Sequence, residues 1–89
     1  MTFAVPASIR MGDAPAALAA GVDAIARGET SFDFSGLASA DSSTVSVCLA
    51  WQRAAATRGA ALAMVNVPPT LKKLAALYGV DAILFAAHH

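Results

Sequence analysis

The sequence predicts a single α/β domain in which helices pack against a small, partly parallel β-sheet. Short apolar segments alternate along the chain with longer segments whose apolar residues recur at helical spacing, and this alternation is typical of such a fold. The chain has 89 residues, which suffice for one modest core and are too few for a second domain. We therefore expect one domain over residues 1–89.

Four segments are expected to be extended. The first covers residues 3–11 and contains Pro6, which cannot donate a hydrogen bond and so confines this segment to an edge or a break. The second covers residues 31–37, with phenylalanines at its apolar positions. Residues 61–67 read as a largely buried strand, and residues 81–85 as a short final strand or extended tail.

Three helices are expected between these strands. The first should begin at Asp13, which is placed to cap it, and end at Gly28, because glycine takes the left-handed conformation without penalty. Its apolar stripe consists of Leu18, Val22, Ile25 and Ala26. The last helix should begin at Pro68 and Pro69, since proline is accommodated in a first turn, and end at Gly79. Its apolar stripe consists of Leu71, Leu74, Ala75 and Tyr78.

The central helix is expected from Ser42 or Ser43 to about Arg58. A step of 100° per residue from Val45 defines one broad, mainly apolar sector, which consists of Val45, Cys48, Leu49, Gln52, Ala55 and Ala56. Trp51 falls on the rim of this sector. Two interpretations of this tryptophan stay open, a core residue and an anchor for a partner, since tryptophan is enriched at interaction hot spots.

Charge and cysteine content argue against several classes of protein. Six basic and six acidic residues give no net charge, and no basic patch extends beyond Lys72 and Lys73, which argues against nucleic acid as a partner. Cys48 is the single cysteine, so neither an internal disulfide nor a zinc site is indicated and we expect a reducing compartment. The N-terminus lacks a signal-peptide pattern, and no apolar run approaches the ~18 residues that span a bilayer. These features predict a soluble, cytoplasmic protein without direct membrane insertion.

Residue patterns typical of enzymes are missing from the sequence. It contains neither a metal-ligand cluster nor a glycine-rich phosphate-binding loop, so we expect this chain to bind no metal and no cofactor. A serine nucleophile would need His88 or His89 as its base, and these two residues are expected to be a tail or a cloning remnant. Asp33 and Asp41 could form a carboxylate pair, but their spacing does not require one. We expect a protein without enzymatic activity.

The stretch Asp41-Ser42-Ser43-Thr44 stands at the expected start of the central helix. Each of these residues can accept a hydrogen bond from an unpaired backbone N–H group, yet one such residue is enough to cap a helix. One interpretation is capping together with a polar turn. The other is a regulatory or docking edge, because a phosphate on a hydroxyl there would suit the positive end of the helix dipole. The nearby backbone N–H groups could also bind a partner.

Several segments resemble the STAS domain family. Phe34-Ser35-Gly36-Leu37 and Asp41-Ser42-Ser43, followed by an apolar helix, resemble the central motif of STAS domains, the fold of the anti-sigma-factor antagonists. Residues 49–55, 65–68 and especially 74–80 are similar to one branch, the MlaB-like STAS subunits of the Mla phospholipid transporter of Gram-negative bacteria. The resemblance implies a small mixed β-sheet of about four strands with helices packed largely on one side.

The resemblance also implies a function. An MlaB-like chain would be a non-catalytic subunit that binds the cytoplasmic, MlaF-like ATP-binding subunit of an ABC transporter and supports its assembly or activity. It would be peripheral to the inner membrane through this partner, which would bind the ATP, in a system that maintains outer-membrane lipid asymmetry. The expected contact residues are Asp41, Ser42 and Ser43, together with Thr44 and Trp51.

Two other functions stay open. In the antagonists, the hydroxyl residue directly after the aspartate is phosphorylated by a partner kinase, and Ser42 stands at that position. The antagonists continue with Gly-Leu after the residue that corresponds to Ser43, whereas this chain has Thr44 and Val45, which weakens the case for a kinase-dependent switch. The third possibility is a hydrolase that uses Ser42 or Ser43.

Overall fold

A computed structural model describes residues 2–85 of the chain, so His88 and His89 lie outside the described residues. The helices are α1 (Ala14–Ala26), α2 (Ser42–Ala56), α3 (Pro69–Leu77) and α4 (Asp81–Phe85). The strands are β1 (Thr2–Ala4), β2 (Ser8–Ile9), β3 (Ser31–Asp33), β4 (Ser39–Ala40) and β5 (Ala63–Val65). The α/β class that the sequence predicts is confirmed.

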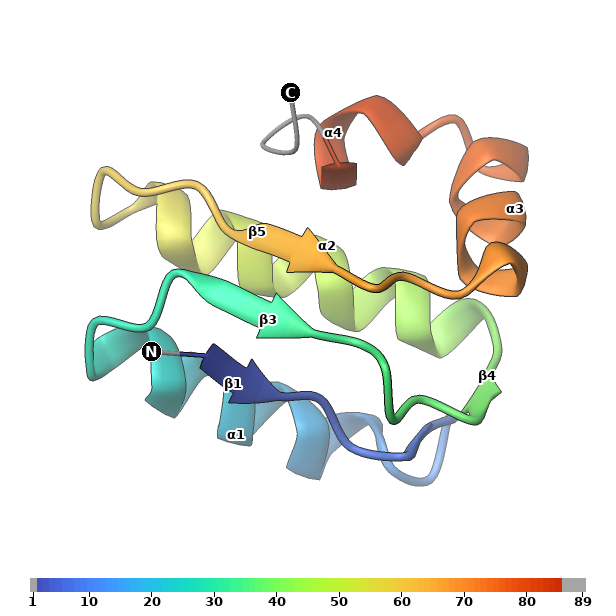
Figure 1. Cartoon of the computed structure of the whole chain (residues 1–89), viewed down its shortest axis with the longest axis horizontal. Coiled ribbons are helices and arrows are strands. Elements are labelled where there is room, and N and C mark those ends of the chain that lie inside the picture. The colour runs from blue at the N-terminus through green and yellow to red at the C-terminus, as the bar shows by residue number, and fades with distance from the viewer. Residues whose placement is uncertain (1, 86–89) are drawn as a thin grey trace.

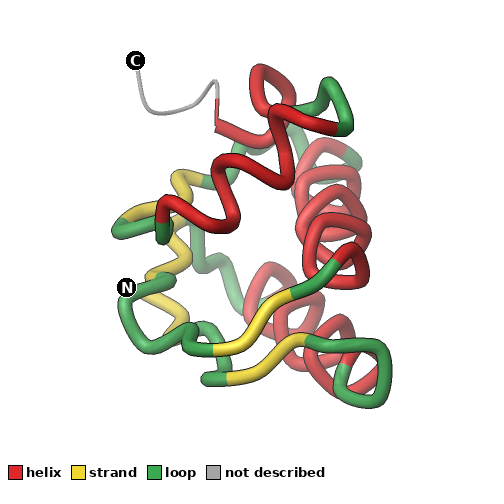
Figure 2. Tube along the Cα trace, turned by 90° about the vertical axis from the view of Figure 1, so that its right-hand side faces the viewer, coloured by secondary structure: helices red, strands yellow, loops and turns green. Residues whose placement is uncertain are grey.

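The strands of residues 2–85 form two small parallel sheets. The larger sheet has the order β1-β3-β5, and the smaller one consists of β2 and β4. Figure 1 shows α1 and α2 behind the larger sheet, with α3 and α4 beyond its β5 edge. In the view of Figure 2, α1 and α2 form a layer separate from the strands of the larger sheet. Helices on one side are therefore found as expected, whereas the strand pairs of the described part are all parallel rather than mixed.

Pro6 explains why the N-terminal segment contributes to both sheets. The amide of Val5 still donates to the carbonyl of Asp33 at 2.9 Å, but Pro6 has no N–H group to continue the ladder. The chain resumes pairing at β2, whose partner β4 is a strand that the sequence did not predict. Because β2 is the element before α1 and β4 the element before α2, their pairing brings the starts of these two helices together.

The larger sheet has one apolar face. Phe3, Phe32 and Met64 lie opposite one another on adjacent strands, and Phe32 and Met64 are fully buried. Successive side chains of a strand point to opposite faces, so Thr2 and Ala4 belong to the other face, and both are exposed. The pattern explains why helices cover only one side.

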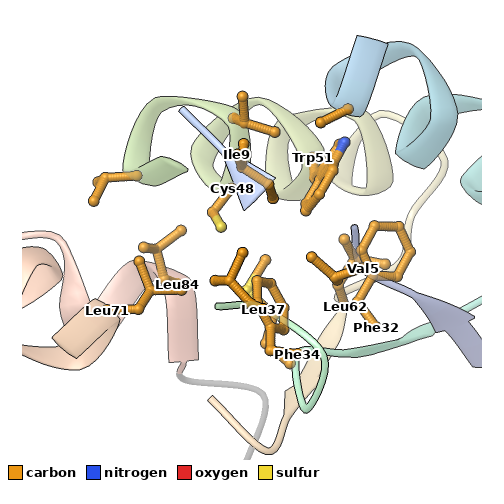
Figure 3. Packing of buried hydrophobic residues seen from close by; sticks show 14 of the residues in the cluster. Val5, Ile9, Phe32, Phe34, Leu37, Cys48, Trp51, Leu62, Leu71 and Leu84 are labelled. Atoms are coloured by element: carbon orange, nitrogen blue, oxygen red, sulfur yellow. The ribbon is translucent and has the colours of Figure 1, made fainter. Parts of the chain in front are cut away.

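Trp51 of α2 lies at the centre of the core (Figure 3) and is 0% exposed. The centroid of its ring is 5.0 Å from that of Phe32 and 6.3 Å from that of Phe34, both in edge-on arrangements. The expected position of Trp51 at the rim of the apolar sector is therefore wrong. Of the two interpretations that the sequence left open, its burial supports the core residue.

Gly21 allows α1 to pack closely against this tryptophan. A Cβ atom on Gly21 would lie 2.1 Å from Nε1 of Trp51, and this Nε1 donates a hydrogen bond to the carbonyl of Leu18 at 3.2 Å. The buried residues of α1 are Ala17, Gly21, Ala24 and Ile25. The expected stripe is therefore correct at Ile25, whereas Leu18 is half-buried and Val22 and Ala26 are exposed. Glycine stands at position 21 because a larger side chain would collide with the indole.

The other buried positions agree in part with the expected stripes. Confirmed as buried are Val45, Cys48, Ala55, Leu71 and Ala75. Leu49, Gln52 and Leu74 are half-buried, and Ala56 and Tyr78 are exposed. Thr44 and Val47 are buried although the periodicity did not mark them. Helix α2 contacts α1 on one side and both α3 and α4 on the other, so its buried sector is wider than that of a helix with one neighbour.

The segment expected to be a final strand is helix α4. Gln52 of α2 holds it in place, because its side-chain amide donates to the carbonyl of Leu84 at 2.9 Å and to that of Leu62 at 3.1 Å. The amide of Leu62 in turn donates to Oε1 of Gln52 at 3.2 Å. Gly79 has φ +72° and ends α3 as predicted, which allows the chain to turn into α4.

Candidate functional site

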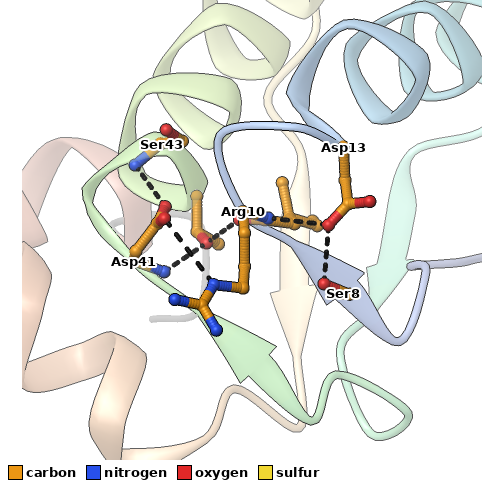
Figure 4. A network of polar contacts seen from close by, with 7 residues as sticks. Ser8, Arg10, Asp13, Asp41 and Ser43 are labelled. Atoms are coloured by element: carbon orange, nitrogen blue, oxygen red, sulfur yellow. Dashed lines mark hydrogen bonds and ion pairs between the residues drawn. The ribbon is translucent and has the colours of Figure 1, made fainter.

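The candidate site is the N-terminal end of α2, where the motif residues Asp41, Ser42, Ser43 and Thr44 lie. Figure 4 shows Asp41 and Ser43 of this motif, with Arg10 beside Asp41. The preceding strand β4 pairs with β2, so this end of the helix is fixed against the N-terminal segment of the chain. The start of α2 is therefore fixed by the pairing of β4 with β2 and does not follow a free loop.

Asp41 and Thr44 form a capping box. The carboxylate of Asp41 accepts a hydrogen bond from the amide of Ser43 at 2.8 Å, and Oγ1 of Thr44 accepts one from the amide of Asp41 at 3.0 Å. The same hydroxyl donates to the carbonyl of Ile9 in β2. Since Thr44 is fully buried, its hydroxyl has a structural role that links α2 to β2.

Ser42 is the exposed member of the motif, whereas Ser43 and Asp41 are half-buried. Within residues 2–85, no hydrogen bond engages the hydroxyl of Ser42. The capping function is thus carried by Asp41 and Thr44, and the hydroxyl of Ser42 is left accessible at the first turn. The prediction that Ser42 is exposed at a helix start is confirmed.

Thr44 and Trp51 do not reach the surface, although both were expected near a contact edge. Thr44 is held by the hydrogen bonds of the capping box, and Trp51 lies between α1 and the phenylalanines of the sheet. A partner that binds the folded domain would therefore not touch their side chains. Their role in the site is to position the helix that carries Ser42.

Arg10 and Asp13 flank the tip of α2, and the sequence did not mark Arg10. Nε of Arg10 lies 3.9 Å from Oδ2 of Asp41, and its side chain is 63% exposed. Asp13 does not cap α1 as expected, because its carboxylate accepts hydrogen bonds from the hydroxyl of Ser8 at 2.6 Å and the amide of Arg10 at 3.2 Å. These bonds, first that of Ser8, lower the pKa of Asp13.

A second polar cluster lies at the carboxyl ends of β3 and β5. The carboxylate of Asp33 accepts hydrogen bonds from the side chain of Asn66 at 3.0 Å and from the amide of Ser35 at 2.9 Å. These bonds lower the pKa of Asp33, with that of Asn66 the main cause. Asp33 and Asp41 thus have different partners and do not form the carboxylate pair considered from the sequence.

Cys48 lies inside the core and faces no reactive partner. Burial raises the pKa of its thiol to about 12, so the thiol stays protonated and unreactive at neutral pH. Among residues 2–85 no group of three or more histidine, cysteine, aspartate or glutamate side chains could hold a metal ion.

An apolar groove between α1 and α2 begins beside the candidate site. It has a volume of about 430 Å³, and its lining includes Met11, Ala14 and Leu18 on one wall and Ser43, Ser46 and Ala50 on the other. The sequence reasoning missed this groove. The signal that could have revealed it is the lack of charged residues in the facing segments 14–22 and 42–52.

A family model described as Mlab, STAS domain matches residues 6–85. The chain therefore belongs to the STAS domain family, and the match is consistent with the MlaB-like branch suggested by its motifs. Neither curated protein sequences nor solved structures gave a match. Within the described residues, none of the helices combines the length and hydropathy that crossing a bilayer would require.

Proposed function

We propose that this protein is a non-catalytic STAS subunit that binds the ATP-binding subunit of a phospholipid ABC transporter. In this proposal the tip of α2 formed by Asp41, Ser42 and Ser43 contacts the partner. The partner binds the ATP, and the complex lies on the cytoplasmic side of the inner membrane. There the subunit supports the assembly or activity of a system that maintains outer-membrane lipid asymmetry.

The observation that carries the proposal is the exposed hydroxyl of Ser42 on a rigidly held helix tip. Thr44 and Asp41 satisfy the backbone groups of the tip, so Ser42 is not needed for capping. A preorganised contact loses little conformational entropy on binding, which favours affinity. The family match over residues 6–85 supports the choice of the MlaB-like branch.

A simple mechanism follows from binding equilibria. A subunit that binds only the assembled or nucleotide-competent form of the ATPase stabilises that form by mass action. The STAS subunit therefore needs no catalytic group of its own to raise transport activity.

The test is the substitution Ser42→Arg in the complex with the ATP-binding subunit of the transporter. A long cation at the tip should clash with the partner and weaken binding by at least roughly tenfold, as substitutions at interface hot spots do. The matched control is Thr70→Arg, which changes an exposed hydroxyl residue in the first turn of α3. Isothermal titration calorimetry measures both affinities, and circular dichroism checks the folds. Equal binding by the two variants would contradict the contact assignment.

The anti-sigma-factor antagonist remains the second candidate, and the same exposed hydroxyl favours it. A phosphate on Ser42 would lie at the N-terminal end of α2, where the helix dipole favours negative charge. A serine kinase gene beside this gene, and one phosphate on Ser42 in a kinase assay followed by mass spectrometry, would support this function. Genes for an ABC permease and a lipid-binding protein would support the transporter.

A further inference from the structure

We propose that the groove between α1 and α2 binds an uncharged, apolar segment of the same ATP-binding subunit. This inference rests on the proposed function and adds a second part to the contact surface. The tip of α2 would provide the polar contacts, and the groove would provide the apolar ones.

The walls of the groove are suited to apolar side chains. Met11 is 79% exposed at one end, which is unusual for a large apolar side chain that has no partner. Leu18 and Ala50 are half-buried in the walls, and the exposed hydroxyl of Ser46 is one of the few polar groups there. An apolar segment in the groove would cover these surfaces without leaving a buried charge unpaired.

The second observation that supports the groove is the lack of charged residues in the helix segments on either side of it. Residues 14–22 of α1 and 42–52 of α2 contain no lysine, arginine, aspartate or glutamate, although both helices have exposed positions. Charged residues make up 13% of the whole chain, so their absence from these two segments is a local depletion, as is found in the cores of interfaces. Charge complementarity therefore calls for an uncharged segment of the partner.

The groove adjoins the tip of α2, and for this reason we assign both to the same partner. Ser43 belongs both to the capping motif and to the wall of the groove, so a protein that binds Ser42 would also reach the groove. The exposed apolar surface on α3 differs, because Lys73 lies beside Leu77 there. Leu77 is 78% exposed and so provides a matched control away from the groove.

The test compares single charges in the groove and on α3. Met11→Glu and Ser46→Glu should each weaken binding of the purified ATP-binding subunit by at least roughly tenfold, because a carboxylate would be buried without a partner. Leu77→Glu should change the affinity by less than about twofold, as for surface substitutions outside an interface. Thermal melts of the free variants show that the domain is still folded.

A cross-link then identifies the occupant. Ser46→Cys can be labelled with a benzophenone maleimide, because the native thiol of Cys48 is buried and stays protonated. Irradiation of the complex should link position 46 to a peptide of the ATP-binding subunit that lacks charged side chains at the contact. Leu77→Cys, labelled in the same way, should give no link to that subunit.

The outcomes separate the two proposals. If Ser42→Arg abolishes binding while the groove variants bind normally, the groove is not part of the interface and the proposed function stands. A link from position 46 to a second copy of this chain, or to no protein, would also overturn the groove assignment. If the wild-type protein does not bind the ATP-binding subunit, both proposals are wrong.

Discussion

The two halves of helix α2 use their polar groups in different ways. In the first half, Asp41 and Thr44 satisfy backbone groups of the helix start, which leaves Ser42 and the uncharged groove exposed. In the second half, Gln52 bonds to backbone groups of Leu62 and Leu84 and so holds internal structure together. The side chain next to it, Arg53, is exposed and charged.

The two halves of α2 therefore have different roles. The second half connects the sheet, α2 and α4, so it determines the stability of the C-terminal part of the fold. The first half is fixed by backbone-directed bonds, so its exposed side chains can change without loss of structure. A partner-binding surface is therefore expected at the first half.

The largest expected effect is that of Trp51→Ala, which removes the side chain on which both halves depend. Loss of this buried indole should lower the free energy of unfolding by about 3–5 kcal/mol, since a cavity replaces its contacts with Phe32 and Phe34. Urea denaturation monitored by circular dichroism measures the change. Leu77→Ala is the control and should shift stability by less than about 0.5 kcal/mol. A small decrease in the free energy of unfolding for Trp51→Ala would contradict the expected cavity, because it would mean that neighbouring side chains fill the space left by the indole.

A smaller and local effect is expected for Gln52→Met, which keeps the side-chain length but removes the amide. Backbone groups of Leu62 and Leu84 would lose their partners, at a cost of about 1–3 kcal/mol. Hydrogen exchange should quicken at the amide of Leu62 and within α4, while the amides of Ser43 and Thr44 should keep their rates. Arg53→Met is the matched control on the same helix. An equal rise in the exchange rates of the amides of Ser43 and Thr44 would contradict the different roles of the two halves of α2.

The smallest effect concerns acid pH and the hydrogen bonds of Asp13, which flanks the tip. The pKa of Asp13 is lowered below its usual value of 3.8, so its contribution to stability is present above about pH 3.8. This contribution is lost as the pH falls through the lower pKa of the folded state, because the unfolded chain binds the proton more readily. Asp13→Asn should therefore be less stable than the wild type at neutral pH, and the difference should shrink in strong acid. Carboxyl NMR titration gives the pKa, and a normal value would contradict the hydrogen bonds of Asp13 with Ser8 and Arg10.

Much of the fold could be predicted because local patterns determine it. The break at Pro6, the left-handed glycine after α3 and the start of α2 at its polar cluster all depend on the chemistry of single residues or their near neighbours. The candidate tip could be predicted for the same reason, since capping residues are recognised from the sequence alone. Ser42 was also expected to be exposed at this helix start, and it is.

The remaining features depend on which segments meet. Periodicity placed Trp51 at the rim because it considers only the angular position of each residue around its own helix, and it could not show that Gly21 on another helix leaves space for the indole. Residues 81–85 likewise read as a strand, because the sequence alone does not show that Gln52 of α2 donates a hydrogen bond to the carbonyl of Leu84. In the structure these residues form helix α4. The groove lies between α1 and α2, which are distant in sequence and whose starts are joined by the pairing of β2 with β4. Local chemistry thus determined helices α1 to α3 and the tip. Tertiary packing decided the state of residues 81–85, what is buried and which surface is exposed, because these depend on contacts between residues distant in sequence.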